Sequence, residues 1–351
     1  MGFATKRHKQ YKNAGNNLYF LCFFVALTPV LFAACPRNDP PPRPRASIST
    51  GTRPVASVAP VVATFNGERA MDHVRKQIEF GPRPPDSPQL AKTRAYIVNE
   101  LKSYGLAVSL DEFTATTPRG EKKMANIVGE VTGETNQLIL ITSHYDTKFY
   151  NDMYFVGAND PAASVATLLE IGRVLGSVKE KPKATYRLVF FDGEEALCEE
   201  WDECHNGDEP DHTYGSRHYL AQLQSRNELE RTHALILLDM MGYKNLELGR
   251  DNLSTRWLQD IIWQTGRELG YGKIFVDRQE GVGGDDHEPF IEAGVAAVDL
   301  IQLASYPYWH KADDTIDKLS SQSMKVVGET VLASLPKIAA AKKPNKVSAA
   351  D

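Results

Sequence analysis

The stretch that most constrains the fold of this chain is residues 186–195, YRLVFFDGEE, where an apolar run ends abruptly in three carboxylates. Apart from Arg187, its first six residues are apolar, aromatic or β-branched, which is typical of a strand buried in a parallel sheet. Asp192, Glu194 and Glu195 follow at the carboxyl end, where open α/β sheets bind their ligands. We expect one glutamate to bind a metal and the other to carry a proton, although two adjacent glutamates alone would be better explained as a solvated turn.

Strand and helix patterns alternate through most of the chain. Strands are expected at residues 107–113, 125–130, 138–142, 186–191, 234–239, 274–276 and 297–301. Helices are expected at residues 66–78, 87–104, 160–175, 215–224, 254–269, 286–293 and 320–335. This alternation predicts an α/β fold with a mixed, mostly parallel central sheet and helices on both faces.

Potential metal ligands follow four of the predicted strands. They are His144, Glu195, Asp239 and His310, and Asp160 opens the helix that begins with Asp160-Pro161. Singly, each is better explained as a helix cap or a hydrogen-bonded loop residue. Because the carboxyl ends of parallel strands share one edge, the set predicts a site with two imidazoles and three carboxylates, which suits zinc.

The same blocks resemble those of the zinc aminopeptidase superfamily in order and spacing. They are His144-Tyr-Asp, Gly157-Ala-Asn-Asp160, Phe191-Asp-Gly-Glu-Glu195, Leu238-Asp239, Asp286-His287-Glu-Pro-Phe290 and His310. The resemblance implies a three-layer α/β/α domain of the phosphorylase/hydrolase-like type. Within the superfamily, Phe155 to Asp160, Tyr214-Gly-Ser-Arg-His218, Asp285-Asp286-His287 and Trp309-His310 resemble the glutaminyl-peptide cyclotransferases more than the aminopeptidases.

The cyclase resemblance implies a role for each site residue. One zinc ion would be held by Asp160, Glu195 and His310, and Glu194 would move the proton. Asp239 and Asp285 would form an acidic pair that shares a proton near the leaving amine. Trp309 would wall the substrate pocket, and Trp201 would match a second pocket tryptophan. The substrate would be a peptide or protein with an N-terminal glutamine, which is converted to pyroglutamate with release of ammonia.

Two other functions remain open from the sequence. A di-zinc aminopeptidase would use Asp160 as the bridging ligand and would add His144 and Asp239 for a second metal ion, and all of these residues are present. A non-catalytic binding domain of the same fold is a minor alternative. Loss of activity normally removes ligands or the proton-carrying glutamate, and none is missing here.

The N-terminal part differs in kind from the rest. Basic residues precede an uncharged apolar stretch at residues 18–34, and small residues stand directly before Cys35, which resembles a bacterial lipobox. We expect residues 1–35 to be a signal or lipoprotein-like segment, although a plain signal peptide or an uncleaved anchor would fit as well. Each reading exports the protein, to the periplasm or outer surface, with possible membrane attachment by lipid at Cys35.

Composition predicts the domain boundaries and the kinds of partner. A Pro-rich tether is expected at residues 36–64, one catalytic domain at 65–340 and a flexible tail at 341–351. The net charge of −5 provides no basic surface for nucleic acid, and we expect a monomer. Cys198 and Cys204 are close enough in sequence for a disulfide in an oxidising compartment, although free thiols fit too.

Overall fold

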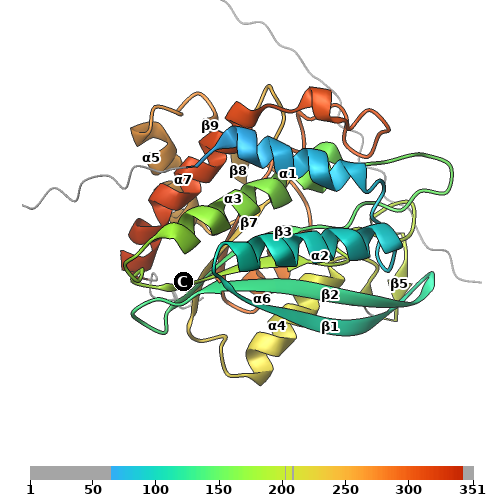
Figure 1. The fold of residues 1–351 in the computed structure, drawn as a ribbon, viewed down its shortest axis with the longest axis horizontal. Helices are drawn as coiled ribbons and strands as arrows, with labels where there is room; N and C mark the ends of the chain where they lie inside the picture. Colours follow the sequence, from blue (N-terminus) through green and yellow to red (C-terminus); the bar gives the residue numbers. More distant parts are fainter. Residues whose placement is uncertain (1–64, 202, 208, 343–351) are drawn as a thin grey trace, which may run out of the picture. The chain divides into compact units, whose positions relative to one another are not determined.

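The computed structural model describes residues 65–342 apart from residues 202 and 208, and Figure 1 shows it as a ribbon. Its α-helices are α1 (Gly67–Glu79), α2 (Pro88–Ser103), α3 (Ser164–Ser177), α4 (Tyr214–Ser225), α5 (Arg256–Glu268), α6 (Glu288–Glu292) and α7 (Ser321–Ala340). Its strands are β1 (Ala107–Thr117), β2 (Gly120–Val131), β3 (Leu138–His144), β4 (Thr185–Phe191), β5 (His205–Asn206), β6 (Glu209–Pro210), β7 (Thr232–Leu238), β8 (Leu248–Asp251), β9 (Phe275–Glu280) and β10 (Ala296–Leu300). A π-helical turn, η1 (Ala158–Ala163), precedes α3, and a 3-10 turn, η2 (Ile316–Lys318), precedes α7.

One six-stranded sheet organises the domain, with its strands in the order β1-β2-β4-β3-β7-β10. The strands β4, β3, β7 and β10 run parallel, whereas β2 is antiparallel to both of its neighbours. Every residue of β3 and β7 is buried, because these central strands are covered on both faces. The mixed, mostly parallel sheet predicted from the sequence is therefore confirmed.

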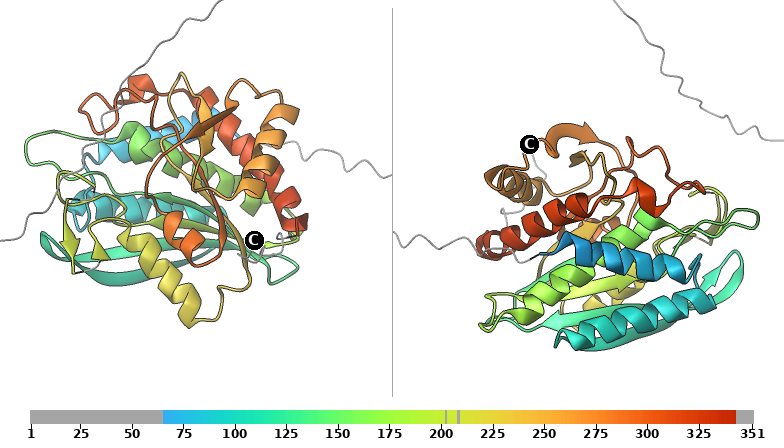
Figure 2. Two further views of the ribbon diagram at one scale, coloured as in Figure 1. Left: turned by 180° about the vertical axis from the view of Figure 1, so that it is seen from behind. Right: turned by 45° about the horizontal axis from the view of Figure 1, so that its top comes forward.

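Helices cover both faces of this sheet. Figures 1 and 2 show α1, α2, α3, α5 and α7 on one side and the shorter pair, α4 and α6, on the other. The larger apolar cluster includes Leu168 of α3 and Val327 of α7. The smaller cluster includes Leu223 of α4 and Phe290 of α6, which pack on the opposite face of the strands. The two clusters give the three layers that the sequence resemblance implied.

The strand order changes direction around β3. The chain places β4 on one side of β3 and, later, β7 on its other side. At such a switch point the loops that leave neighbouring strands diverge, and a crevice opens at the carboxyl ends of the strands. The fold therefore offers its binding crevice at the ends of β3, β4 and β7, where the candidate ligands follow in the sequence.

The helix expected to begin at Asp160 begins at Ser164 instead. Asp160 lies inside η1 and has non-helical torsion angles, with φ at −112° and ψ at 88°. The ring of a proline disfavours the helical conformation in the residue before it, and Pro161 follows Asp160 directly. Asp160 is thus held on an irregular turn rather than on a regular helix.

Two smaller departures concern short strands. The strand expected at residues 274–276 lies outside the central sheet, because β9 pairs in parallel with β8 as a separate two-stranded sheet. The sequence patterns also predicted neither β8 nor the strands β5 and β6, which pair as an antiparallel hairpin in the acidic segment at residues 199–211. Strands of two residues are too short to carry an alternating pattern.

Several expectations lie outside the described residues. They concern the signal-like segment at residues 1–35, the tether at 36–64 and all but the first two residues of the tail. Within the described part of the chain, none of the helices has the length and apolar character needed to span a membrane.

Replacing Gly328 by alanine tests how α7 packs on the first residue of the described domain. An added methyl group would overlap the ring of Phe65. Overpacking usually costs about 1–3 kcal/mol, and alanine favours a helix over glycine by roughly 1 kcal/mol. We therefore expect the free energy of unfolding, measured by urea denaturation, to show a net fall of up to about 2 kcal/mol. The same change in a Phe65→Ala background should cost less, and a stabilised Gly328→Ala variant would contradict the packing.

Candidate active site

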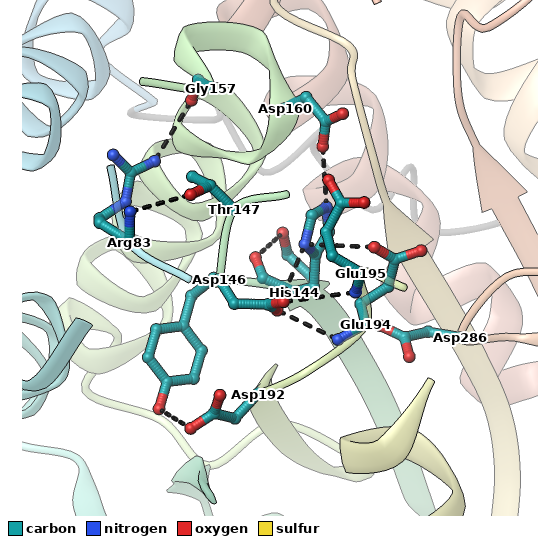
Figure 3. Close-up of polar contacts among 12 residues, drawn as sticks. Arg83, His144, Asp146, Thr147, Gly157, Asp160, Asp192, Glu194, Glu195 and Asp286 are labelled. Atoms are coloured by element: carbon teal, nitrogen blue, oxygen red, sulfur yellow. Dashed lines mark hydrogen bonds and ion pairs between the residues drawn. The ribbon is translucent and has the colours of Figure 1, made fainter. Parts of the chain in front are cut away.

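Five segments carry the candidate site to one end of the sheet. His144 is the last residue of β3, Glu194 and Glu195 lie in the loop after β4, and Asp239 directly follows β7. Asp160 comes from η1, and the loop after β10 brings His310 to the same place. Figure 3 shows His144, Asp160, Glu194 and Glu195 facing one another across this edge.

Asp160, Glu195 and His310 form the first ligand group, with one ligand atom from each lying within 4.8 Å of the others. His310 Nε2 is 3.5 Å from Asp160 Oδ2 and 3.3 Å from Glu195 Oε2. Both carboxylate oxygens of Glu195 are buried and have no hydrogen-bond partner among the residues that the structure describes. A buried carboxylate that lacks a hydrogen bond and faces an imidazole at 3.3 Å favours a nearby cation, so this group fits a zinc ion.

The electrostatics of this group agree with that fit. Burial alone would raise the pKa of Glu195, but His310, Lys148 and His144 together hold the pKa of that carboxyl below its usual value. Burial would likewise lower the pKa of His310, but Glu195 raises it. Glu195 thus favours its negative form and His310 its positive form. A bound divalent ion would supply the positive charge between the carboxylates that the imidazolium of His310 supplies without it.

His144, Asp160 and Asp239 form a second group of potential ligands within 4.8 Å of one another. His144 Nε2 lies 3.2 Å from Asp160 Oδ1 and 3.3 Å from Asp239 Oδ1. Asp160 therefore presents one oxygen to each group, as a bridging carboxylate would. His144 is fully buried. Unlike Asp160 and Asp239, it does not line the cavity that opens at this edge of the sheet.

Glu194 lies beside both groups but is not a member of either. Its Oε2 is 3.6 Å from His144 Nδ1. Burial raises the pKa of Glu194 well above its ordinary value, and the charge of Glu195 raises it further against the opposing effect of His144. A carboxyl group that belongs to neither ligand group and has a raised pKa is a candidate proton carrier.

Asp285 reaches the same cavity from the loop before α6. Burial, followed by the charge of Asp239, raises the pKa of Asp285 to about 7. Burial also raises the pKa of Asp239, although its hydrogen bond with His144 opposes the shift. The carboxyl group that hydrogen-bonds to Asp285 is that of Asp299, whose pKa burial raises well above its ordinary value, and the pairing of Asp285 with Asp239 stays a prediction.

A cavity of about 260 Å³ opens above these groups. This is slightly below the roughly 300–1,000 Å³ of sites for drug-sized ligands, so it suits a single side chain. Its lining includes Asp160, Glu194, Glu195, Asp239, Asp285 and His310, with apolar walls from Trp201, Met240, Val282, Ile301, Leu303 and Trp309. Trp309 stacks on the ring of His310 with centroids 4.3 Å apart and is 42% exposed, so its indole is available to a ligand.

Sequence reasoning missed the residues that hold the ligands in place. The carboxylate of Asp146 accepts hydrogen bonds from the backbone N–H groups of Glu194 and Glu195, at 3.1 and 3.3 Å. Asp314 accepts them from Asn159 and Asp160, at 2.9 and 3.1 Å, and from the hydroxyl of Tyr306. Asp146 is the last residue of the His-Tyr-Asp block, and Asp314 follows His310 by four residues. The sequence does not indicate which backbone N–H groups these carboxylates bind.

Two buried cations support the same region. Arg83 is fully buried and donates to the carbonyls of Gly81, Val156 and Gly157. Figure 3 shows the contact with Gly157. Burial lowers the pKa of Arg83 to about 10, against the charges of Asp314, Asp146 and Asp160. Lys148 is buried as well, and its Nζ donates to the carbonyl of Ala196 at 2.7 Å, next to Glu195. These cations partly compensate the many buried carboxylates.

The sequence and the fold both match known proteins. Residues 126–335 match peptidase family M28. The chain is 28% identical over 285 residues to a glutaminyl-peptide cyclotransferase from Bos taurus, a match that covers 68% of this chain and 73% of that protein. A solved glutaminyl cyclase from an Acidobacteriales bacterium is 34% identical with a TM-score of 0.71, over 78% of this chain and 94% of that one.

A leucine aminopeptidase precursor from Bacteroides thetaiotaomicron is also similar, at 25% identity and a TM-score of 0.71, over 78% of this chain and 97% of that one. The predicted resemblance to glutaminyl cyclases within the zinc aminopeptidase type of fold is therefore confirmed. The fold alone does not separate the two reactions, because both kinds of enzyme share it.

The role of Asp314 can be tested through metal affinity. In an Asp314→Asn variant the amide keeps one acceptor oxygen but loses the charge and the second acceptor, so the backbone of Asn159 and Asp160 is less firmly held. We expect zinc affinity, measured by competition with a chromophoric chelator, to fall roughly 10- to 100-fold. Asp313→Asn, at the exposed neighbouring position, is the matched control and should bind zinc like the wild type.

Proposed function

This chain belongs to peptidase family M28, and on that premise we propose that it is a zinc-dependent glutaminyl cyclase. It would convert the N-terminal glutamine of peptides or proteins to pyroglutamate and release ammonia. The observation that carries the proposal is the content of one cavity. Glu194, the group Asp160, Glu195 and His310, the acidic residue Asp285 and two tryptophans all line it.

The reaction defines what the site must do. The nitrogen of the α-amine forms a bond to the δ-carbon of the glutamine side chain, and the bond from that carbon to the amide nitrogen breaks. The α-amine has an ordinary pKa of about 7.7–8.0, so it must lose a proton before it can attack, and the leaving nitrogen must gain one. No net proton is consumed when one group performs both transfers.

Asp160, Glu195 and His310 would hold the zinc ion, which when bound polarises the γ-carboxamide toward attack. Glu194 would accept the proton from the α-amine and return it to the departing ammonia. Its backbone N–H is fixed by Asp146, and the raised pKa of its carboxyl suits both directions of transfer.

Asp239 and Asp285 would accept hydrogen bonds from the amine and from the ammonia that forms. Asp285, with a pKa raised to about 7, can also donate when it is protonated. Trp309 and Trp201 would pack on the side chain of the glutamine and exclude water, together with Ile301 and Leu303. A cavity of this size admits one side chain and leaves the rest of the peptide outside.

A di-zinc aminopeptidase is the second candidate, because His144, Asp160 and Asp239 stand together as a possible second metal group. In that case Glu194 would deprotonate a water molecule that cleaves the first peptide bond. Asp285 and Trp309, which the sequence resemblance ties to cyclases, favour the first candidate. A binding domain without activity is less well supported, because the proton carrier and every ligand are retained.

We further propose that the enzyme is exported to the periplasm or outer surface, with lipid attachment at Cys35, and acts as a monomer. The basic and apolar layout of the first 35 residues supports export. The disulfide between Cys198 and Cys204 also suits an oxidising compartment.

The role of Glu194 predicts a clear separation between metal binding and turnover. A Glu194→Gln variant keeps the shape of the side chain but cannot accept the proton. We expect its zinc content to match the wild type while kcat for a Gln-initiated peptide falls roughly 10²- to 10⁴-fold. Glu199→Gln, in the exposed insert, is the matched control and should keep wild-type kcat. Turnover near the wild-type level in Glu194→Gln would show that another group moves the proton.

Metal content and products measured on one preparation separate the two candidate enzymes. We expect close to one zinc ion per chain, ammonia release from Gln-initiated peptides, and little release of aniline from leucine anilides. Chelation should abolish ammonia release, and added zinc should restore it. Close to two zinc ions per chain, with rapid anilide cleavage and no cyclisation, would identify an aminopeptidase instead.

A further inference from the structure

A short disulfide loop carries one of the pocket tryptophans. Cys198 and Cys204 form a disulfide across a sequence separation of 6, and Trp201 lies at the middle of the loop that it closes. Trp201 lines the cavity, so this loop forms part of the mouth of the site. The proposed chemistry at Glu194 and the metal ligands makes no use of the disulfide, which leaves its purpose to be explained.

The indole of Trp201 is held between two partners. Its ring stacks on His212, with centroids 4.1 Å apart and an angle of 19° between the planes. On the side of the cavity wall, a β-carbon at Gly284 would stand 3.5 Å from Trp201 Nε1, so the indole lies against the backbone there. Both contacts require the loop to stay in one position relative to His212 and to the segment before Asp285.

The two ends of the loop are tied to a single buried residue. The backbone N–H of Cys198 donates to Asp211 Oδ2 at 2.7 Å, and the N–H of Asp211 donates to the carbonyl of Cys204 at 3.3 Å. Asp211 is fully buried, and the hydroxyl of Tyr214 donates to its Oδ1 at 2.6 Å. Asp211 thus connects the loop to the first turn of α4 and to His212, its neighbour in the chain.

The loop cannot fix Trp201 by packing of its own. Between the two cysteines the sequence is Glu-Glu-Trp-Asp-Glu, in which the tryptophan is the sole apolar residue and the acidic residues repel one another. Within the loop, the N–H groups of Glu199 and Glu200 share one acceptor, an oxygen of Glu203. Such a segment gains little free energy from burying apolar side chains. The disulfide instead limits the conformational freedom of the loop.

We propose that the Cys198–Cys204 disulfide and Asp211 position Trp201 at the mouth of the pocket, so that substrate affinity depends on the oxidation state of this cysteine pair. In the oxidised protein the indole is held ready for the substrate. An external dithiol would cleave the S–S bond to two thiols and would itself be oxidised to a disulfide, after which the loop is free to move. The inference rests on the proposed function only where it concerns substrate affinity.

The kinetic test uses a protein that cannot form the disulfide. For the double variant Cys198→Ser with Cys204→Ser, we expect KM for a Gln-initiated peptide to rise about three- to tenfold, the range that one aromatic contact contributes. The value of kcat and the zinc content should stay near the wild type, because neither cysteine touches the reacting groups. Trp201→Ala should raise KM to a similar extent, and combining it with the double variant should add little.

Asp211→Asn provides a second variant in which the disulfide is kept. It should raise KM in the same direction by loosening the ends of the loop, and it keeps the test valid if the cysteine variant folds poorly. The wild type treated with dithiothreitol should show the same rise in KM. The double serine variant under the same treatment is the control for zinc removal by the reductant, and its KM should not change.

A second readout does not depend on activity. The emission of Trp201, obtained as the difference between the wild type and Trp201→Phe, should become more accessible to acrylamide when the disulfide is reduced. This measurement tests the positioning even if the protein fails to cyclise glutamine, so failure of the two proposals can be told apart. Unchanged quenching on reduction, or a wild-type KM in the double serine variant, would overturn the inference.

Discussion

The structure depends on the burial of like charges at one edge of its sheet. Asp160, Glu194, Glu195, Asp239 and Asp285 are all buried there, and carboxylates brought this close repel one another in a medium of low dielectric. Such a cluster is stable only with protons or cations among its members. The two histidines, His144 and His310, lie between the carboxylates at distances of 3.2–3.5 Å and mark where cations belong. Around them, buried Arg83 and Lys148 supply further positive charge without entering the ligand groups.

The fold supplies the rigidity that this cluster needs. Each ligand follows a strand or turn whose backbone is fixed by its neighbours, and the reversal of strand order around β3 opens the crevice in which they meet. Loops would normally leave such residues mobile, but Asp146 and Asp314 bind the backbone N–H groups of the two ligand-bearing loops. Asp314 also accepts from Tyr306, so the turn that carries Asp160 is joined to the segment that carries His310. We therefore expect metal affinity to depend on acidic residues that do not touch the metal ion.

Cyclisation and peptide hydrolysis call for nearly the same polar groups, since both need a polarised carbonyl and a carboxylate that moves a proton. What differs is the nucleophile, which is the substrate's own amine in one case and water in the other. The walls of the cavity are therefore decisive. Trp201, Trp309 and Ile301 line the cavity together with Asp285, and in the proposed function they would exclude water while Asp285 would bind the amine. The disulfide loop acts in the same way, because it positions Trp201 in the cavity wall and does not touch the ligand groups.

The sequence by itself determined the alternation of strands and helices, the mixed sheet and the placement of His144, Glu195 and Asp239 at strand ends, because burial and the periodicity of side chains are local properties. Only the tertiary structure decided how the turns and loops that carry these groups are held. The turn that holds Asp160 departs from a helix because of Pro161, and β9 pairs with β8 instead of joining the main sheet. The roles of Asp146, Asp314 and Asp211 likewise came from the structure alone. Each binds a backbone N–H group, and because every residue except proline carries one, no sequence pattern can identify the partner before the chain has folded.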